Sequence, residues 1–91
     1  MEKSGDRVLS QINYARLISN SNIHSMPIIA VYDHPEDYPD KFVARVYDMD
    51  KPTNLIVLGD TLDEVREAIP QSMAKIDRQQ GDDPCIVETW I

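Results

Sequence analysis

The spacing of apolar residues changes along the chain at about Met26. Apolar side chains between residues 8 and 18 recur near the 3.6-residue period of a helix, and Asp6 stands where an N-cap would. The following segment, "SNSNIHS" (19–25), consists of loop-forming residues. We therefore predict a helical N-terminal arm at 1–25, separable from a single domain at 26–91.

From Met26 onward the pattern is typical of β-strands. "PIIAVYD" (27–33) is a continuous β-branched run, which suits a buried strand, and "KFVARVYD" (41–48) alternates between two faces. "LIVLG" (55–59) reads as a third strand, and the turn-forming stretches 34–40 and 49–54 separate the three. Such short connections predict an antiparallel meander.

The stretch "LIVLGDTLDEVREAIP" (55–70) predicts a strand that turns directly into a helix. Gly59 suits the corner, and Thr61 to Glu64 matches a capping box, in which Thr61 accepts from the amide of residue 64 and Glu64 reaches back to the amide of Thr61. Pro70 predicts a stop or kink near Ile69, because proline removes a helical hydrogen bond. A second helical piece is then expected through Met73 and Ile76, closed by Gly81.

The last residues, "CIVETWI" (85–91), predict a final strand. The expected fold class is thus α+β: an antiparallel three- to four-stranded sheet with one main covering helix, in the order β-β-β-α-β, preceded by an N-terminal helix.

The net charge of −7 resides in the domain rather than in the arm. Residues 26–91 contain six basic and fourteen acidic residues, a net −8, whereas residues 1–25 carry +1. An acidic body repels nucleic-acid backbones and anionic lipid and favours a basic protein partner. No apolar run approaches the roughly 18–20 residues of a membrane span. The single cysteine, Cys85, excludes an intramolecular disulfide, so we expect a cytoplasmic protein.

The sequence offers no candidate for catalysis or cofactor binding. There is no G-x-S-x-G motif, and three glycines in 91 residues provide no phosphate-binding loop. His24 and His34 lack a second ligand at metal-binding spacing, and "DMDKPTN" (48–54) lacks the glycine and terminal glutamate of a calcium loop. We therefore predict a protein that is not an enzyme, with no catalytic, cofactor-binding or metal-binding residues.

Two features are candidates for partner binding. The predicted helix start is acidic and exposed, with Asp60, Asp63, Glu64 and Glu67 as its carboxylates. Trp90 is the second candidate, since tryptophan is enriched at interface hot spots; the alternative is that it packs in the core. An open edge strand would also allow pairing with a second chain as a homodimer.

The segment "GDTLDEVREAI" (59–69) resembles the HicB-type antitoxin domain, a partial ribonuclease-H-like fold. In that family a three-stranded meander precedes the same joint and a strand follows the helix. The chain departs from the family pattern at "MDKPTN" (49–54), which lacks the usual glycine, and at Pro70. The resemblance implies an acidic bacterial or phage domain that masks a small basic ribonuclease toxin.

The functional hypothesis is accordingly a non-catalytic, HicB-antitoxin-like module that binds a basic partner. One alternative is a stand-alone phage-type inhibitor or charge mimic of nucleic acid, which requires the carboxylates of 33–50 and 60–67 to form one continuous face. Another is a structural homo-oligomer built on sheet edges, with Trp90 at the contact.

Overall fold

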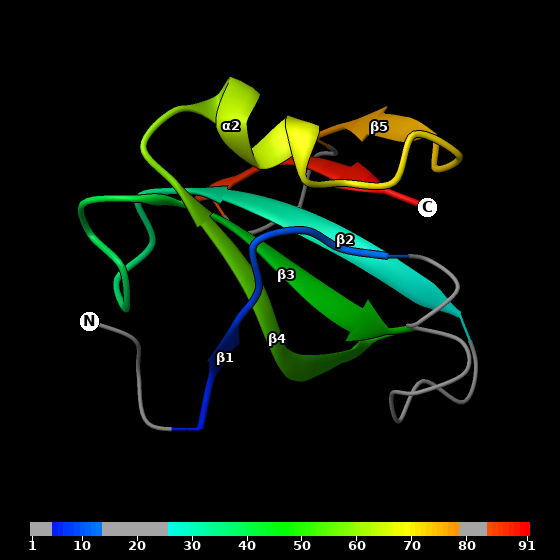
Figure 1. Ribbon diagram of the computed structural model, residues 1–91, viewed down its shortest axis with the longest axis horizontal. Coiled ribbons are helices and arrows are strands. Elements are labelled where there is room, and N and C mark those ends of the chain that lie inside the picture. The colour runs from blue at the N-terminus through cyan, green and yellow to red at the C-terminus, as the bar shows by residue number, and fades with distance from the viewer. Residues whose placement is uncertain (1–4, 14–25, 79–83) are drawn as a thin grey trace.

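A six-stranded mixed sheet with one short helix makes up the computed structural model, which describes residues 5–13, 26–78 and 84–91 (Figure 1). The spatial order of the strands is β1-β4-β3-β2-β6-β5. The parallel pair is β1 with β4; the other neighbouring strands are antiparallel. The elements are β1 (Arg7–Val8), β2 (Pro27–Asp33), β3 (Phe42–Asp48), β4 (Lys51–Gly59), α2 (Leu62–Glu67), β5 (Lys75–Asp77) and β6 (Ile86–Trp90).

The predicted meander is present as β2, β3 and β4. Ile29 lies opposite Val46, and Ala44 lies opposite Val57, so apolar residues of the three strands share one face. The turn between β3 and β4 is shorter than predicted, because β4 already begins at Lys51. Pro52 is accepted there because the register shifts beside it, and a residue without an N–H fits an irregular position.

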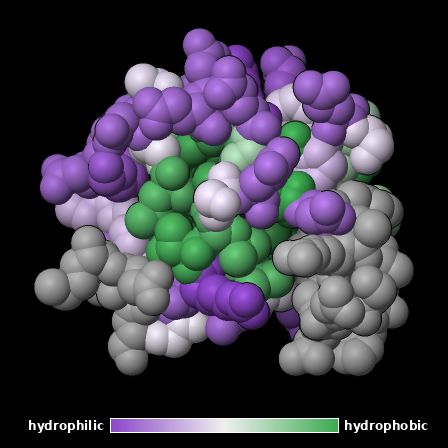
Figure 2. Space-filling model, viewed as in Figure 1, coloured by the Kyte–Doolittle hydropathy of each residue, from purple (hydrophilic) through white to green (hydrophobic). Residues whose placement is uncertain are grey.

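The main core lies on one face of the sheet, against α2 and residues 9–12. Figure 2 shows apolar side chains gathered at the middle of this face, with hydrophilic ones over α2 and the loop at the upper left. The buried members of this core are Ile12, Ile29, Val31, Ala44, Val46, Val57, Val65, Ala68, Ile69 and Met73.

A smaller apolar cluster lies on the opposite face of the sheet. Val43 and Ile56 point to this side from β3 and β4, and Tyr38 from the 34–41 loop covers them. The loop turns at His34, which has a positive φ of 50°, and closes with a hydrogen bond from the His34 amide to the Lys41 carbonyl at 3.0 Å. One face is therefore covered by a helix and the other by a loop.

The predicted fold class is wrong: the described residues form mostly sheet with one helix of six residues, rather than a small antiparallel sheet with a main covering helix. The structure has six strands rather than three or four, and one pair is parallel. No N-terminal helix is found in residues 5–13, which form β1 and irregular chain; the rest of the predicted helix lies outside the described residues. Asp6 does not cap a helix, because its carboxylate binds Arg45 and Tyr38 instead. Tertiary contacts override the local helical spacing here.

The second helical piece after Pro70 is also wrong. The helix ends at Glu67, ahead of Pro70 as predicted, but Lys75–Asp77 forms edge strand β5. Ala74 and Ile91 exchange two backbone hydrogen bonds, of 2.7 and 3.0 Å, which align β5 beside β6. A strand placed next to β6 satisfies backbone groups that a short helix interrupted by proline would leave open.

Candidate functional site

The joint between β4 and α2 is built around Gly59. A Cβ at this position would lie 2.7 Å from Cγ2 of Val65, which is fully buried in the core. The next residues cap the helix: Thr61 Oγ1 accepts from the Glu64 amide at 3.2 Å, and Glu64 Oε2 accepts from the Asp60 amide at 3.2 Å. The capping box is thus confirmed for Thr61, with Asp60 rather than Thr61 as the donor to Glu64.

This joint meets the 34–41 loop at one end of the sheet. Phe42 lies opposite Gly59, and Lys41 Nζ bonds the carboxylate of Asp60. The pKa of Lys41 is raised first by the hydrogen bond to Asp60 and then by the nearby charges of Asp60, Glu64 and Asp40. We call the 34–41 loop together with residues 60–64 the acidic end; these two segments contain the carboxylates of Glu36, Asp37, Asp40, Asp60, Asp63 and Glu64.

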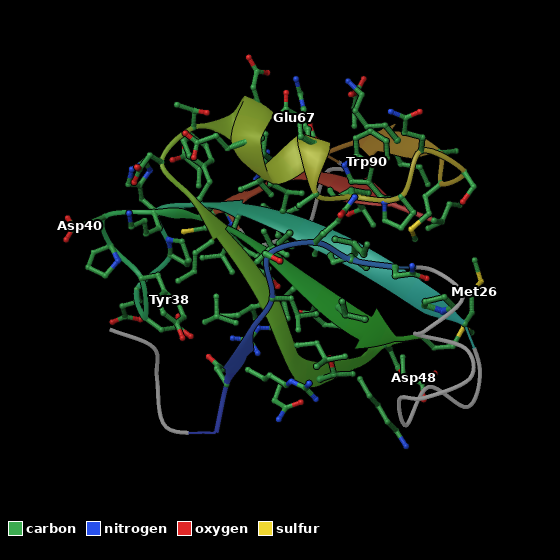
Figure 3. All side chains as sticks on the ribbon, in the orientation of Figure 1. Met26, Tyr38, Asp40, Asp48, Glu67 and Trp90 are labelled. Carbon is green, nitrogen blue, oxygen red and sulfur yellow. The ribbon has the colours of Figure 1, made fainter. Side chains whose placement is uncertain are left out.

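The predicted acidic residues are on the surface of this end and of the helix. The side chain of Asp63 is 90% exposed and that of Asp60 69% exposed. Glu67, in the last turn of α2, points away from the domain (Figure 3). The structure therefore brings Asp60 and Glu64 together with Asp40 around Lys41. Asp63 lies in the first turn of α2, near Arg66, and Glu67 lies farther along the helix.

The carboxylates of 33–50 are divided between the two ends of the sheet. Asp48 lies opposite Pro27 and Lys51, with Asp50 in the adjoining turn, at the end away from Asp40 (Figure 3). The single continuous face that a charge mimic of nucleic acid requires is thus interrupted.

Trp90 faces the helix-covered core. Its side chain packs against the buried core cluster, and its indole Nε1 donates to Glu88 Oε2 at 2.8 Å. Glu88 is 1% exposed, and Arg66 of α2 reaches it with Nε at 3.0 Å and Nη2 at 2.6 Å. Trp90 is therefore linked to the inner side of α2 and lies apart from the acidic end.

The Glu88 carboxylate stays ionised inside the domain because its partners donate to both oxygens. Burial raises the pKa of Glu88, but the hydrogen bonds from Arg66 and Trp90 and the Arg66 charge outweigh burial and hold it below the ordinary value. On the other partner, the hydrogen bond to Glu88 raises the pKa of Arg66. This cluster joins the helix to the sheet.

A second ion pair lies on the opposite face. Arg45 holds the Asp6 carboxylate through two hydrogen bonds of 3.1 Å, and the Tyr38 hydroxyl donates to it at 2.9 Å. Arg45 Nη1 also donates to the Thr53 carbonyl at 2.8 Å. Burial lowers the pKa of Arg45, but the hydrogen bonds and charge of Asp6 produce a net rise. A residue of the N-terminal arm is thus anchored to the middle of the sheet.

Beside this pair is a shallow hollow of about 130 Å³, lined by Tyr32, Pro35, Asp37, Tyr38, Val43 and Arg45. The hydroxyls of Tyr32 and Tyr47 bond to each other across the same face. Such a volume holds only a few non-hydrogen atoms, well below the roughly 300 Å³ of a small-molecule site.

Neither metal ligands nor membrane spans are found in the described ranges. No three His, Cys, Asp or Glu side chains of residues 5–13, 26–78 and 84–91 are placed to hold a metal ion. Within the same ranges, no helix has the length and apolar character needed to cross a membrane.

Comparison with known proteins identifies no relative. No family model matches the sequence, and no curated protein or solved structure matches it. The HicB-type resemblance therefore stays a prediction.

Neither the ion pair between Arg66 and Glu88 nor that between Arg45 and Asp6 was predicted from the sequence. The alternation of 41–48 placed Arg45 on one of two faces without a partner, and Glu88 was only part of the predicted final strand at 85–91. A charged residue inside an otherwise apolar strand is a signal of a buried pair, since isolated charges are rarely buried. The partner cannot be named from sequence, because Asp6 and Arg45 are 39 residues apart.

Proposed function

We propose that the protein is a non-catalytic binding module that recognises a basic segment of another protein through the acidic end. The observation that carries this proposal is the convergence of two separate acidic segments, the 34–41 loop and the helix start, at one end of the sheet. The resulting potential attracts a cationic partner and raises its association rate.

The exposure of these carboxylates supports the proposal. Only part of their charge is neutralised within the chain: Lys41 pairs with Asp60, Arg66 Nη1 lies 3.9 Å from Asp63, and Arg45 Nη2 lies 3.8 Å from Asp37. Within the described residues, Glu36 and Asp40 make no ion pair. Exposed pairs contribute little to stability, so a partner's lysines and arginines can replace the internal ones at small cost.

The test compares two variants with the same loss of charge. Asp40→Asn with Asp63→Asn removes two charges from the acidic end, whereas Asp48→Asn with Asp50→Asn removes two from the opposite end. A partner captured by the full chain from its source cell at low salt is purified, and its affinity for each variant is measured. We expect at least a tenfold loss for the first variant, with a reduced salt dependence, and little change for the second.

Equal losses for both variants would show that net charge alone matters, and unchanged binding by both would refute the acidic end as the interface. If the captured partner is a ribonuclease whose RNA cleavage the protein inhibits, the antitoxin-like hypothesis is supported. A partner that is itself acidic would contradict the proposal.

A further inference from the structure

Residues 5–13, here called the docked segment, contact the body of the protein as a bound peptide would. The backbone of Leu9 donates to Ile56 at 2.7 Å, that of Ile12 donates to Ala68 at 2.8 Å, and Arg7–Val8 pairs with β4. Together with Asp6, which binds Arg45 and Tyr38, each of these contacts joins the segment to residues at least thirty positions away.

The docked segment crosses the edge of the sheet. Asp6 binds on the loop-covered face, whereas Ile12 is 2% exposed in the core of the helix-covered face. The surface that receives it, here called the seat, has two separate recognition features: Arg45 and Tyr38 for a carboxylate, and an apolar site beside Ala68 for Ile12. The seat therefore contacts two features of the segment, an acidic residue and an isoleucine six positions later.

The connection between the docked segment and β2 is long enough to reach another molecule. Twelve residues separate Asn13 from Met26, and an extended chain of that length spans about 40 Å. The longest dimension of the molecule is 31 Å. A docked segment can consequently occupy the seat of its own chain or that of a neighbouring copy with the same contacts.

We propose that the seat is an exchange interface, in which the docked segment of one chain binds the seat of a second copy and receives that copy's segment in return. A second copy is the occupant because it carries the carboxylate and the isoleucine at the spacing that the seat is seen to accept. The exchange is isologous and closes as a dimer, since each chain both supplies a segment and accepts one. The balance between the monomer, with its own segment docked, and the exchanged dimer depends on the protein concentration relative to the effective concentration of the tethered segment.

The first experiment reverses the charges of the ion pair on separate full-length chains. Asp6→Arg places two arginines at the contact, and Arg45→Asp places two aspartates there, so neither chain can form the pair with itself. In an equimolar mixture, each docked segment matches the seat of the other variant. The control is the double variant with both substitutions, in which the reversed pair forms within one chain.

We expect light scattering to give the mixture twice the 10.4 kDa mass of one chain, whereas each single variant and the double variant remain at the mass of one chain at the same concentration. A mixture that stays at the mass of one chain overturns the proposal, because it shows that the segment docks only within its own chain. A single variant that dimerises by itself also overturns the proposal, because such a dimer would form without the ion pair between residues 6 and 45.

A second measurement applies if the charge-reversed chains fail to fold. The full chain with Asp6→Asn, which keeps the shape of the side chain, is titrated with a labelled peptide of residues 5–13, "GDRVLSQIN". We expect this peptide to bind at least tenfold more tightly than the same peptide with asparagine in place of aspartate. Equal affinities for the two peptides, or binding of neither, would overturn recognition of a separate segment by the seat.

Discussion

Arg66 on α2 and Glu88 on β6, 22 residues apart in the sequence, are joined by two hydrogen bonds of 3.0 and 2.6 Å. The carboxylate is 1% exposed, while the Arg66 side chain is 36% exposed and reaches it from the surface. The pair fastens a helix of only six residues, too short to be stable by itself, to the sheet.

Replacing Arg66 with methionine should lower the free energy of unfolding by about 2 kcal/mol, because the buried carboxylate loses its cation. This value is below the usual range for a buried pair because Arg66 is partly in water. Urea unfolding followed by the fluorescence of Trp90, the single tryptophan, measures it. Arg66→Met with Glu88→Leu, which removes both charges, should lose less than Arg66→Met alone; a larger loss would contradict this account.

Stability should fall in acid partly through Glu88. Its pKa is below the ordinary value of 4.5 in the folded state, so the unfolded chain binds the proton first as the pH falls. The contribution of the ionised carboxylate is thus complete above about pH 4.5 and is lost as the pH falls through the lower, folded pKa. The difference in unfolding free energy between the wild type and Glu88→Gln should shrink between neutral pH and about pH 3, and a constant difference would refute the assignment.

Gly59→Ala should destabilise the protein by about 2 kcal/mol, because the new methyl group would meet the buried Val65 at 2.7 Å. The matched test is a double-mutant cycle with Val65→Ala, which removes the Cγ2 atom that the new methyl group would contact. The double variant should be more stable than the sum of the two single losses predicts. Additive losses would show that the contact at Val65 is not the cause.

Thr61→Ala should cost about 1 kcal/mol, because the amide of Glu64 loses its capping acceptor. Thr61→Ser keeps the hydroxyl and should remain within a few tenths of a kcal/mol of the wild type. Thermal or urea unfolding of the three proteins makes the comparison. If the alanine and serine variants are equally stable, the hydroxyl does not cap α2.

The central strands and the joint were predictable because their signals are local. Residues 27–33 and 42–48 carry β-branched runs or period-two alternation, and each forms a strand close to the predicted bounds. The capping box at Thr61 and the stop before Pro70 depend on residues within one helical turn of each other. The exposure of Asp60 and Asp63 followed from the same local pattern.

The edge strands were not predictable, since their conformation depends on distant residues. Arg7–Val8 is extended because β4 is beside it and Asp6 is held by Arg45, although the residue spacing favours a helix. Lys75–Asp77 contains three residues of which one is apolar, and only pairing with β6 makes it a strand. The neighbourhood of Asp40 and Asp60 likewise depends on the register of β3 against β4.

The docked segment also has a consequence for a shorter chain that begins at Met26. Such a chain would lack β1, so the backbone of β4 would face solvent at Leu55 and Ile56. It would also lose Ile12 and expose the apolar surface that Ile12 covers. An uncovered strand edge next to exposed apolar surface is a template for aggregation. Residues 5–13 therefore cover this strand edge and the apolar surface beside it, and a chain that begins at Met26 should aggregate.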